Sequence, residues 1–99
     1  MSFVTTQPEV LAGAASSLSG LGDAMVARNA ATAATTTGLA PAASDIVSAA
    51  TAAQFGQHGL TYQQIAAQAA EVHDQLVAAL RSGANAYGLT EAANAAAAR

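Results

Sequence analysis

The chain is 99 residues long and weighs 9.6 kDa, which is enough for one small domain. About thirty residues are alanine, only 9% are Asp, Glu, Lys or Arg, and the net charge is -3. Its 3 basic residues cannot neutralise several phosphates, so nucleic acid is excluded as a ligand. The absence of cysteine excludes disulfides, thiolate catalysis and the usual structural zinc sites.

The first predicted helix covers residues 7–37. Thr6 is predicted to cap its start, with Glu9 three residues further on reaching back to complete a Thr-x-x-Glu capping box. Pro8 fits the first turn, where its missing N–H breaks no helical hydrogen bond. The pattern therefore predicts a well-defined start for this helix.

A short turn over residues 38–41 is predicted to separate two antiparallel helices. Three threonines weaken the helix before Gly38, Gly38 is a natural end residue, and Pro41 prevents simple continuation. The second helix is predicted over residues 42–82, with Asp45 favourably placed near its positive end. The fold class is therefore all-α, a helical hairpin in a single domain.

Both predicted helices carry large apolar residues at helical spacing. In the first helix they recur every seven residues, with one more on the same stripe, and small residues beside them allow close helix packing. In the second helix they recur at spacings of three, four or seven. The residues predicted to form the hairpin core and a partner interface, with no division between the two, are Leu11, Leu18, Leu21, Met25, Phe55, Tyr62, Ile65, Val72, Leu76 and Leu80.

The second helix has more apolar surface than one neighbouring helix can cover. The chain offers only one other long helix, so we expect the remaining surface to be covered by another molecule. The interface should be apolar and of the obligate class, above roughly 2,000 Å². We also expect the isolated chain to be only marginally stable.

A tail over residues 83–99 is predicted to be exposed and partly ordered, because it is mostly alanine and follows Gly83. Tyr87 and Glu91 would share one face if this tail is helical. A large aromatic residue in a segment otherwise poor in bulky side chains is a prominent recognition handle.

No catalytic, metal or cofactor site is predicted. His58 and His73 lie fifteen residues apart on one helix, too far to share a metal ion, and surface or interface hydrogen bonding is the favoured interpretation. No Gly-x-Ser-x-Gly motif is present, and a two-helix hairpin offers no pocket for a small-molecule substrate. The N-terminus lacks the basic and apolar regions of a Sec or Tat signal peptide, and no run of 18 large apolar residues predicts a membrane span.

The sequence resembles the mycobacterial PE family, which is named for a Pro-Glu pair near the N-terminus. Here that pair is Pro8-Glu9, after an opening Met-Ser-Phe-Val-Thr-Thr-Gln that is typical of the family. The resemblance covers essentially the whole chain and includes the turn between Gly38 and Pro41. Further details resemble short PE proteins linked to the fifth ESX secretion system.

The resemblance implies a heterodimer with a PPE-family protein, in which the two chains form an elongated four-helix bundle. It also implies secretion by a type VII (ESX) system to the cell envelope or beyond, through a Tyr-x-x-x-Asp/Glu signal that Tyr87 and Glu91 match. The Trp-x-Gly part of such a signal resembles a contribution of the PPE chain, and this chain has no Trp. An EspG-type chaperone would act through the PPE chain.

Two other interpretations remain open. The hairpin could pair with a second copy of itself as a homo-oligomeric structural module. Alternatively, its alanine-rich helices could belong to a mycobacterial outer-membrane transport assembly, although no basic amphipathic face predicts direct lipid binding.

Overall fold

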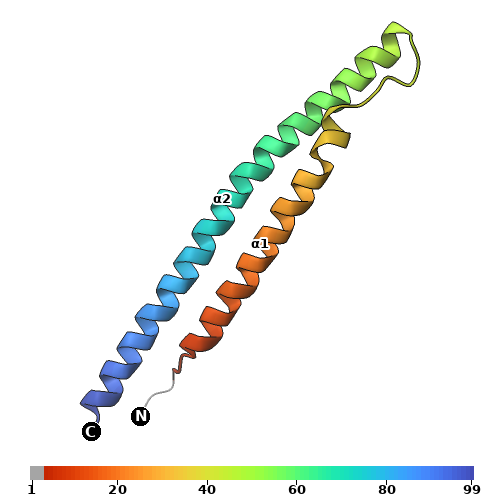
Figure 1. Cartoon of the computed structure of the whole chain (residues 1–99). Coiled ribbons are helices and arrows are strands. Elements are labelled where there is room, and N and C mark those ends of the chain that lie inside the picture. The colour runs from red at the N-terminus through yellow and green to blue at the C-terminus, as the bar shows by residue number, and fades with distance from the viewer. Residues whose placement is uncertain (1–3) are drawn as a thin grey trace. The chain divides into compact units, whose positions relative to one another are not determined.

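A computed structural model describes residues 4–99 of the chain. Two helices account for most of it, α1 from Pro8 to Thr37 and α2 from Ile46 to Ala97 (Figure 1). No strand occurs in these described residues. The prediction of an all-α fold with two long helices is therefore confirmed.

The helices contribute to two compact units. The terminal unit combines Met1–Leu21 with Val72–Arg99, and the central unit is Gly22–Glu71. Within each unit, a stretch of α1 runs antiparallel to a stretch of α2, as a helical hairpin requires (Figure 1). Each unit therefore has its own contacts between the helices.

Small side chains dominate the row of α2 residues that packs against α1. These residues are buried or half-buried, and they repeat at spacings of three or four, the period of two helices packed side by side. We call them the inner row: Ala52, Gly56, Gly59, Gln63, Ala66 and Ala70 in the central unit, and His73, Val77, Leu80, Ala84 and Gly88 in the terminal unit.

The helices of the central unit approach closely at Gly56 and Gly59. A Cβ atom added at Gly59 would lie 2.5 Å from the carbonyl oxygen of Thr36, and one added at Gly56 would lie 2.8 Å from that of Thr37. Real Cβ atoms essentially never come so near a backbone oxygen, so only glycine fits at this separation. The two glycines are therefore close contact points between α1 and α2 in the central unit.

Polar side chains tie the two helices together at two levels. In the central unit, the Tyr62 hydroxyl donates to Oδ1 of Asn29 over 2.9 Å, and the Gln63 amide donates to the Asn29 carbonyl over 3.0 Å. In the terminal unit, Nε2 of His73 bonds the Leu18 carbonyl oxygen and must carry the proton, because a carbonyl only accepts. These bonds help to fix the register of α1 on α2.

The expected capping box at the start of α1 does not form. The Gln7 carbonyl accepts from the backbone N–H groups of Val10 and Leu11, so the helix begins at Pro8, one residue later than the box requires. Pro8 occupies the first helical position, which suits its fixed φ. The Thr6 hydroxyl donates instead to a residue of α2.

The start of α2 also differs from the expectation. A connection over residues 38–45 replaces the predicted turn over 38–41, and α2 begins at Ile46. Asp45 caps it: its carboxylate accepts from the Ser48 backbone N–H and hydroxyl, both over 2.8 Å. These bonds, the backbone N–H first, hold the pKa of the Asp45 carboxyl below its ordinary value. Capping of this kind starts the helix at the cap rather than at Pro41.

The predicted break at residue 83 is absent, and α2 continues to Ala97. Gly83 and Gly88 keep negative φ angles and lie within the helix. The alanines after them have the highest intrinsic helix propensity, and Ala84 is buried against α1. The tail is thus helical rather than broken, while residues 89–99 are exposed as expected.

By length and composition, α1 could also cross a membrane. We expected no such segment because runs of large apolar residues are short, but the alanines of this helix add to its scattered Val, Leu and Met residues and make it sufficiently apolar. A helix that packs within a protein and a segment near the N-terminus pass the same test, so the feature is weak evidence.

We predict that Gly59→Ala lowers the stability of the full-length chain by about 1–3 kcal/mol, because the added methyl group forces the helices apart. Thermal unfolding followed by circular dichroism measures the change. Gly13→Ala is the matched control: nothing lies within 4 Å of its added Cβ, so it should stabilise α1 by about 0.5–1 kcal/mol. An unchanged melting temperature for Gly59→Ala would contradict the close approach.

We predict that Asp45→Ala lowers the melting temperature at neutral pH, since it removes the cap of α2. The lowered pKa sets the sign of the pH dependence. The contribution of the carboxylate is fully present above the ordinary pKa of Asp and is lost as the pH falls through the lower, folded-state value. Melting curves of the two proteins should therefore converge in strong acid, and a constant difference at all pH values would argue against a charged cap.

Candidate functional site

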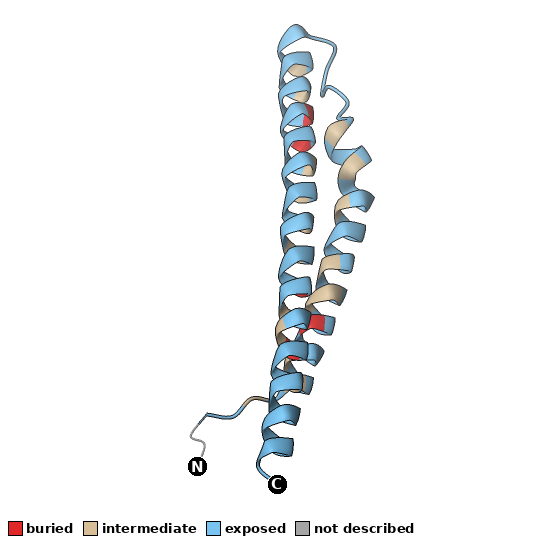
Figure 2. Ribbon diagram, turned by 90° about the vertical axis from the view of Figure 1, so that its left-hand side faces the viewer, coloured by how far each residue is buried: buried red, intermediate tan, exposed pale blue. Residues whose placement is uncertain are grey.

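Large apolar side chains lie on the outside of α2 rather than between the helices. Among the described residues the buried apolar side chains are only Ala15, Val77 and Ala84, and most of the ribbon is exposed (Figure 2). Six large exposed residues each come directly before an inner-row residue, and we call them the apolar row: Phe55, Tyr62 and Ile65 in the central unit, and Val72, Leu76 and Tyr87 in the terminal unit.

The apolar row is far from covered by α1. Val72 is 65% exposed, Leu76 54% and Tyr87 50%. Since successive residues of a helix are about 100° apart, a residue directly before the inner row lies to one side of the contact with α1. The apolar row therefore forms one flank of α2 in each unit.

The opposite flank of α2 is mostly polar. Its residues come directly after inner-row positions, and they include Gln57, Gln64, Glu71, Asp74, Arg81 and Asn85. Leu60 and Leu89 are the large apolar exceptions on this side. Each unit of the hairpin thus has one apolar face and one face suited to water.

In the terminal unit, α1 extends the same apolar face. Val10 and Leu21 come directly before the inward-facing Leu11 and Gly22, and they are 60% and 61% exposed. In an antiparallel helix pair, residues that precede the inward positions of both helices lie on the same side of the pair. The face therefore combines side chains from both helices.

The structure shows which of the ten predicted core and interface residues lie between the helices and which are exposed. This division could not be made from the sequence. Leu11, Leu18 and Leu80 are half-buried between the helices of the terminal unit. The other seven are exposed: Leu21, Met25, Phe55, Tyr62, Ile65, Val72 and Leu76. The inner row was not predicted from the sequence, and its signal was a Gly or Ala directly after Phe55, Ile65 and Tyr87.

Two predicted motifs lie side by side in the terminal unit. The Thr6 hydroxyl donates to Oε1 of Glu91 over 3.3 Å. A Cβ added at Gly88 would lie 3.7 Å from Cβ of Pro8, which is ordinary van der Waals contact. The residues around the Pro8-Glu9 pair therefore contact the turn of α2 between Tyr87 and Glu91, while Glu9 itself is exposed.

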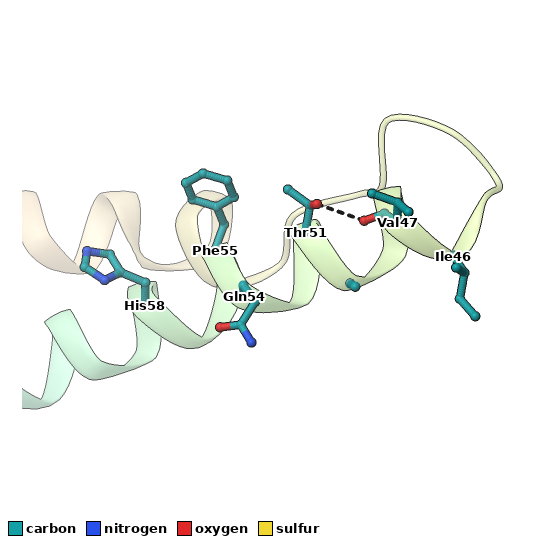
Figure 3. Close-up of a pocket in the computed structure, with 7 residues that line it drawn as sticks. Ile46, Val47, Thr51, Gln54, Phe55 and His58 are labelled. Carbon is teal, nitrogen blue, oxygen red and sulfur yellow. Dashed lines mark hydrogen bonds between the residues drawn. The ribbon is translucent and has the colours of Figure 1, made fainter.

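A shallow groove lies at the start of α2, and all its lining residues come from that one helix (Figure 3). Ile46, Val47 and Phe55 are exposed there, and Thr51 donates to the Val47 carbonyl over 2.8 Å. His58 is the only titratable residue that lines it. A single imidazole without a carboxylate or nucleophile beside it suits apolar contact better than catalysis.

Within residues 4–99, no group of three or more His, Cys, Asp or Glu side chains gathers where it could hold a metal ion. His73 is engaged with α1, whereas His58 lies in the groove. The chemistry that the described surface offers is therefore contact through apolar side chains, with the Tyr87 and Glu91 pair as its most distinctive polar feature.

Comparison with known proteins places this hairpin in a family. The sequence model of the PE family matches residues 4–94. The PE family protein PE13 of Mycobacterium tuberculosis (strain ATCC 25618 / H37Rv) is 56% identical over 98 residues, which make up 99% of each chain. The PE family protein PE8 of the same strain is 51% identical over 98 residues, which are 99% of this chain but 36% of PE8. A family match over most of the residues, together with this identity along nearly all of PE13, shows that the chain belongs to the PE family.

Proposed function

We propose that this PE protein is a non-enzymatic binding partner that forms an obligate heterodimer with a PPE-family protein. The proposal rests on the apolar row, which leaves large side chains such as Phe55, Ile65 and Leu76 in water, although most residues of the inner row beside them are Gly or Ala. Apolar faces of this kind mark protein interfaces. A PPE hairpin laid on the apolar face would complete a four-helix bundle.

The amount of exposed surface supports the proposal. The chain exposes 7459 Å², whereas a folded monomer of its mass exposes about 5,100 Å². The excess is about 2,400 Å², within the range that one partner contributes to a large obligate interface. The near absence of charge on the apolar face fits an interface selected by shape and apolar contact.

Membership of the PE family and the placement of Tyr87 support export by a type VII (ESX) system. Tyr87 is half-exposed on an ordered turn of α2, and Glu91 lies one turn further along the same helix. We propose that this pair is the chain's part of a signal which the PPE chain completes, so that the heterodimer, rather than this chain alone, is secreted to the envelope or beyond. An EspG-type chaperone would act on the PPE chain.

A second candidate function is a part in a membrane-associated transport assembly. The observation that favours it is α1, which is long and apolar enough to cross a bilayer. Co-sedimentation of the purified heterodimer with liposomes tests it. Binding would support a membrane role, and a heterodimer that stays in the supernatant would contradict direct contact with lipid.

We predict that Leu76→Asp abolishes co-purification with the PPE partner, because it places an unpaired charge in a desolvated interface. Ala78→Asp is the matched control: it introduces the same charge on the opposite side of the inward-facing Val77. Affinity purification of the co-expressed pair, scored by the amount of partner recovered, measures both. The proposal fails if Leu76→Asp recovers as much partner as the parent chain.

We predict that Tyr87→Ala blocks secretion while the heterodimer still forms, since one side chain near the end of α2 adds little to a large interface. Immunoblots of culture filtrate and cell lysate separate the two effects. Secretion at the parental level would contradict the assignment of the signal. Loss of the complex would instead mean that Tyr87, at the end of the apolar row, is essential for binding the partner.

A further inference from the structure

Residues 6–8, which lead into α1 and include its first residue, form a segment that contacts the turn of α2 carrying Tyr87 and Glu91. Motif matching alone does not predict this contact. Pro8 lies against Gly88, and the Thr6 hydroxyl bonds the Glu91 carboxylate. Gly88 and Glu91 are one helical turn apart on α2. Two residues of the segment thus hold the same turn at two points.

We propose that Thr6 is a positioning residue for the export signal: its hydroxyl fixes the Glu91 side chain in the orientation that the secretion machinery reads together with Tyr87. The inference rests on the proposed role of Tyr87 and Glu91 as a signal. It adds a residue outside the Tyr-x-x-x-Glu pattern and gives the segment around Pro8 a task in recognition.

The chemistry of the bond permits this role. A carboxylate has two oxygens and accepts several hydrogen bonds, so the bond from Thr6 to Oε1 leaves Oε2 available to a receptor. Hydrogen bonds to an ionised acceptor are stronger than neutral ones, so even an exposed hydroxyl biases the side-chain conformation. Thr6 itself is half-buried, and its bond to Glu91 lies at the surface, where a receptor can reach the carboxylate.

The length of the Glu91 side chain explains why a positioning residue is useful here. Glu has one more rotatable bond than Asp, so more conformations must be lost when it is fixed for recognition. A hydrogen bond that restricts the side chain beforehand removes part of that cost. Asp at this position would be shorter by one methylene group and, with 3.3 Å already separating the two oxygens, would not reach Thr6.

These features define the experiment. The chain is co-expressed with its PPE partner in a mycobacterium that has a functional type VII system, and secreted and cellular protein are quantified for each variant. Thr6→Val removes the hydroxyl but keeps the shape, and Thr6→Ser restores it. Thr61→Val is the matched control, because its hydroxyl bonds only the Gln57 carbonyl of its own helix.

The expected result is that Thr6→Val lowers secretion roughly fivefold, the ratio that one hydrogen bond shifts, with unchanged heterodimer yield. Thr6→Ser should secrete at the parental level, as should Thr61→Val. In a Glu91→Asp background, Thr6→Val should have no effect, since the bond is already absent. A purely structural role for Thr6 would not depend on the length of the acidic side chain.

Three outcomes would overturn the inference. In the first, Thr6→Val leaves secretion unchanged. In the second, Thr6→Val lowers secretion equally in the parent chain and in the Glu91→Asp background. In the third, Thr6→Val raises secretion, which would mean that Thr6 sequesters the carboxylate. Tyr87→Ala, run in parallel, separates this inference from the function on which it rests. If Tyr87→Ala is secreted normally, the signal itself is misassigned. If secretion of Tyr87→Ala is blocked while Thr6→Val is secreted normally, only the role of Thr6 is ruled out.

Discussion

Close contact between two alanine- and glycine-rich helix surfaces is the constraint on which the rest of the structure depends. At Gly56 and Gly59 the backbones come so near that no Cβ fits between them. Such separation leaves no room for a Phe, Ile or Leu at these two positions, so the large apolar side chains of the central unit lie beside the inner row, and Leu80 enters that row only in the terminal unit. The sequence places them directly before the inner-row positions, on one flank of α2, and places charged and amide residues on the other flank. Contacts between small residues and a few hydrogen bonds therefore hold the hairpin together, while its apolar face remains exposed to solvent.

Much of this architecture could be predicted from the sequence, and the errors have identifiable physical causes. Helix content, the end of α1 at Thr37 and the surplus of apolar surface followed from alanine content, the threonines before Gly38, and the spacing of residues such as Ile65 and Val72. The helix starts were displaced because the Gln7 carbonyl rather than the Thr6 side chain begins α1, and because Asp45 caps α2 four residues after Pro41, near which the helix was expected to start. Which side of α2 packs against α1 was not predicted, because periodicity identifies a stripe of residues but does not tell whether the large or the small ones pack inward.

The candidate site shows a similar limit. The Tyr87 and Glu91 pair could be found as a motif, and the segment around Pro8 as a family signature, but nothing in the sequence joins residues that are 85 positions apart. That contact exists because α2 continues through Gly83 and carries Glu91 alongside the start of α1 within the terminal unit. High helix propensity in the alanine-rich end was therefore more informative than the glycines that suggested a break. We expect this chain to act through its exposed apolar face and through contacts such as that between Thr6 and Glu91, rather than through a cavity.

The central claim is that a second polypeptide covers the apolar face and leaves the polar flank in water. Because the chain contains no cysteine, single thiols introduced by Val72→Cys and Asp74→Cys report on the two sides of His73, and their alkylation rates can be measured in the chain alone and in the co-expressed heterodimer. The account predicts that the thiol at position 72 reacts freely in the chain alone and becomes strongly protected in the heterodimer, whereas the thiol at position 74 reacts at similar rates in both. Equal reactivity of position 72 with and without the partner would contradict it.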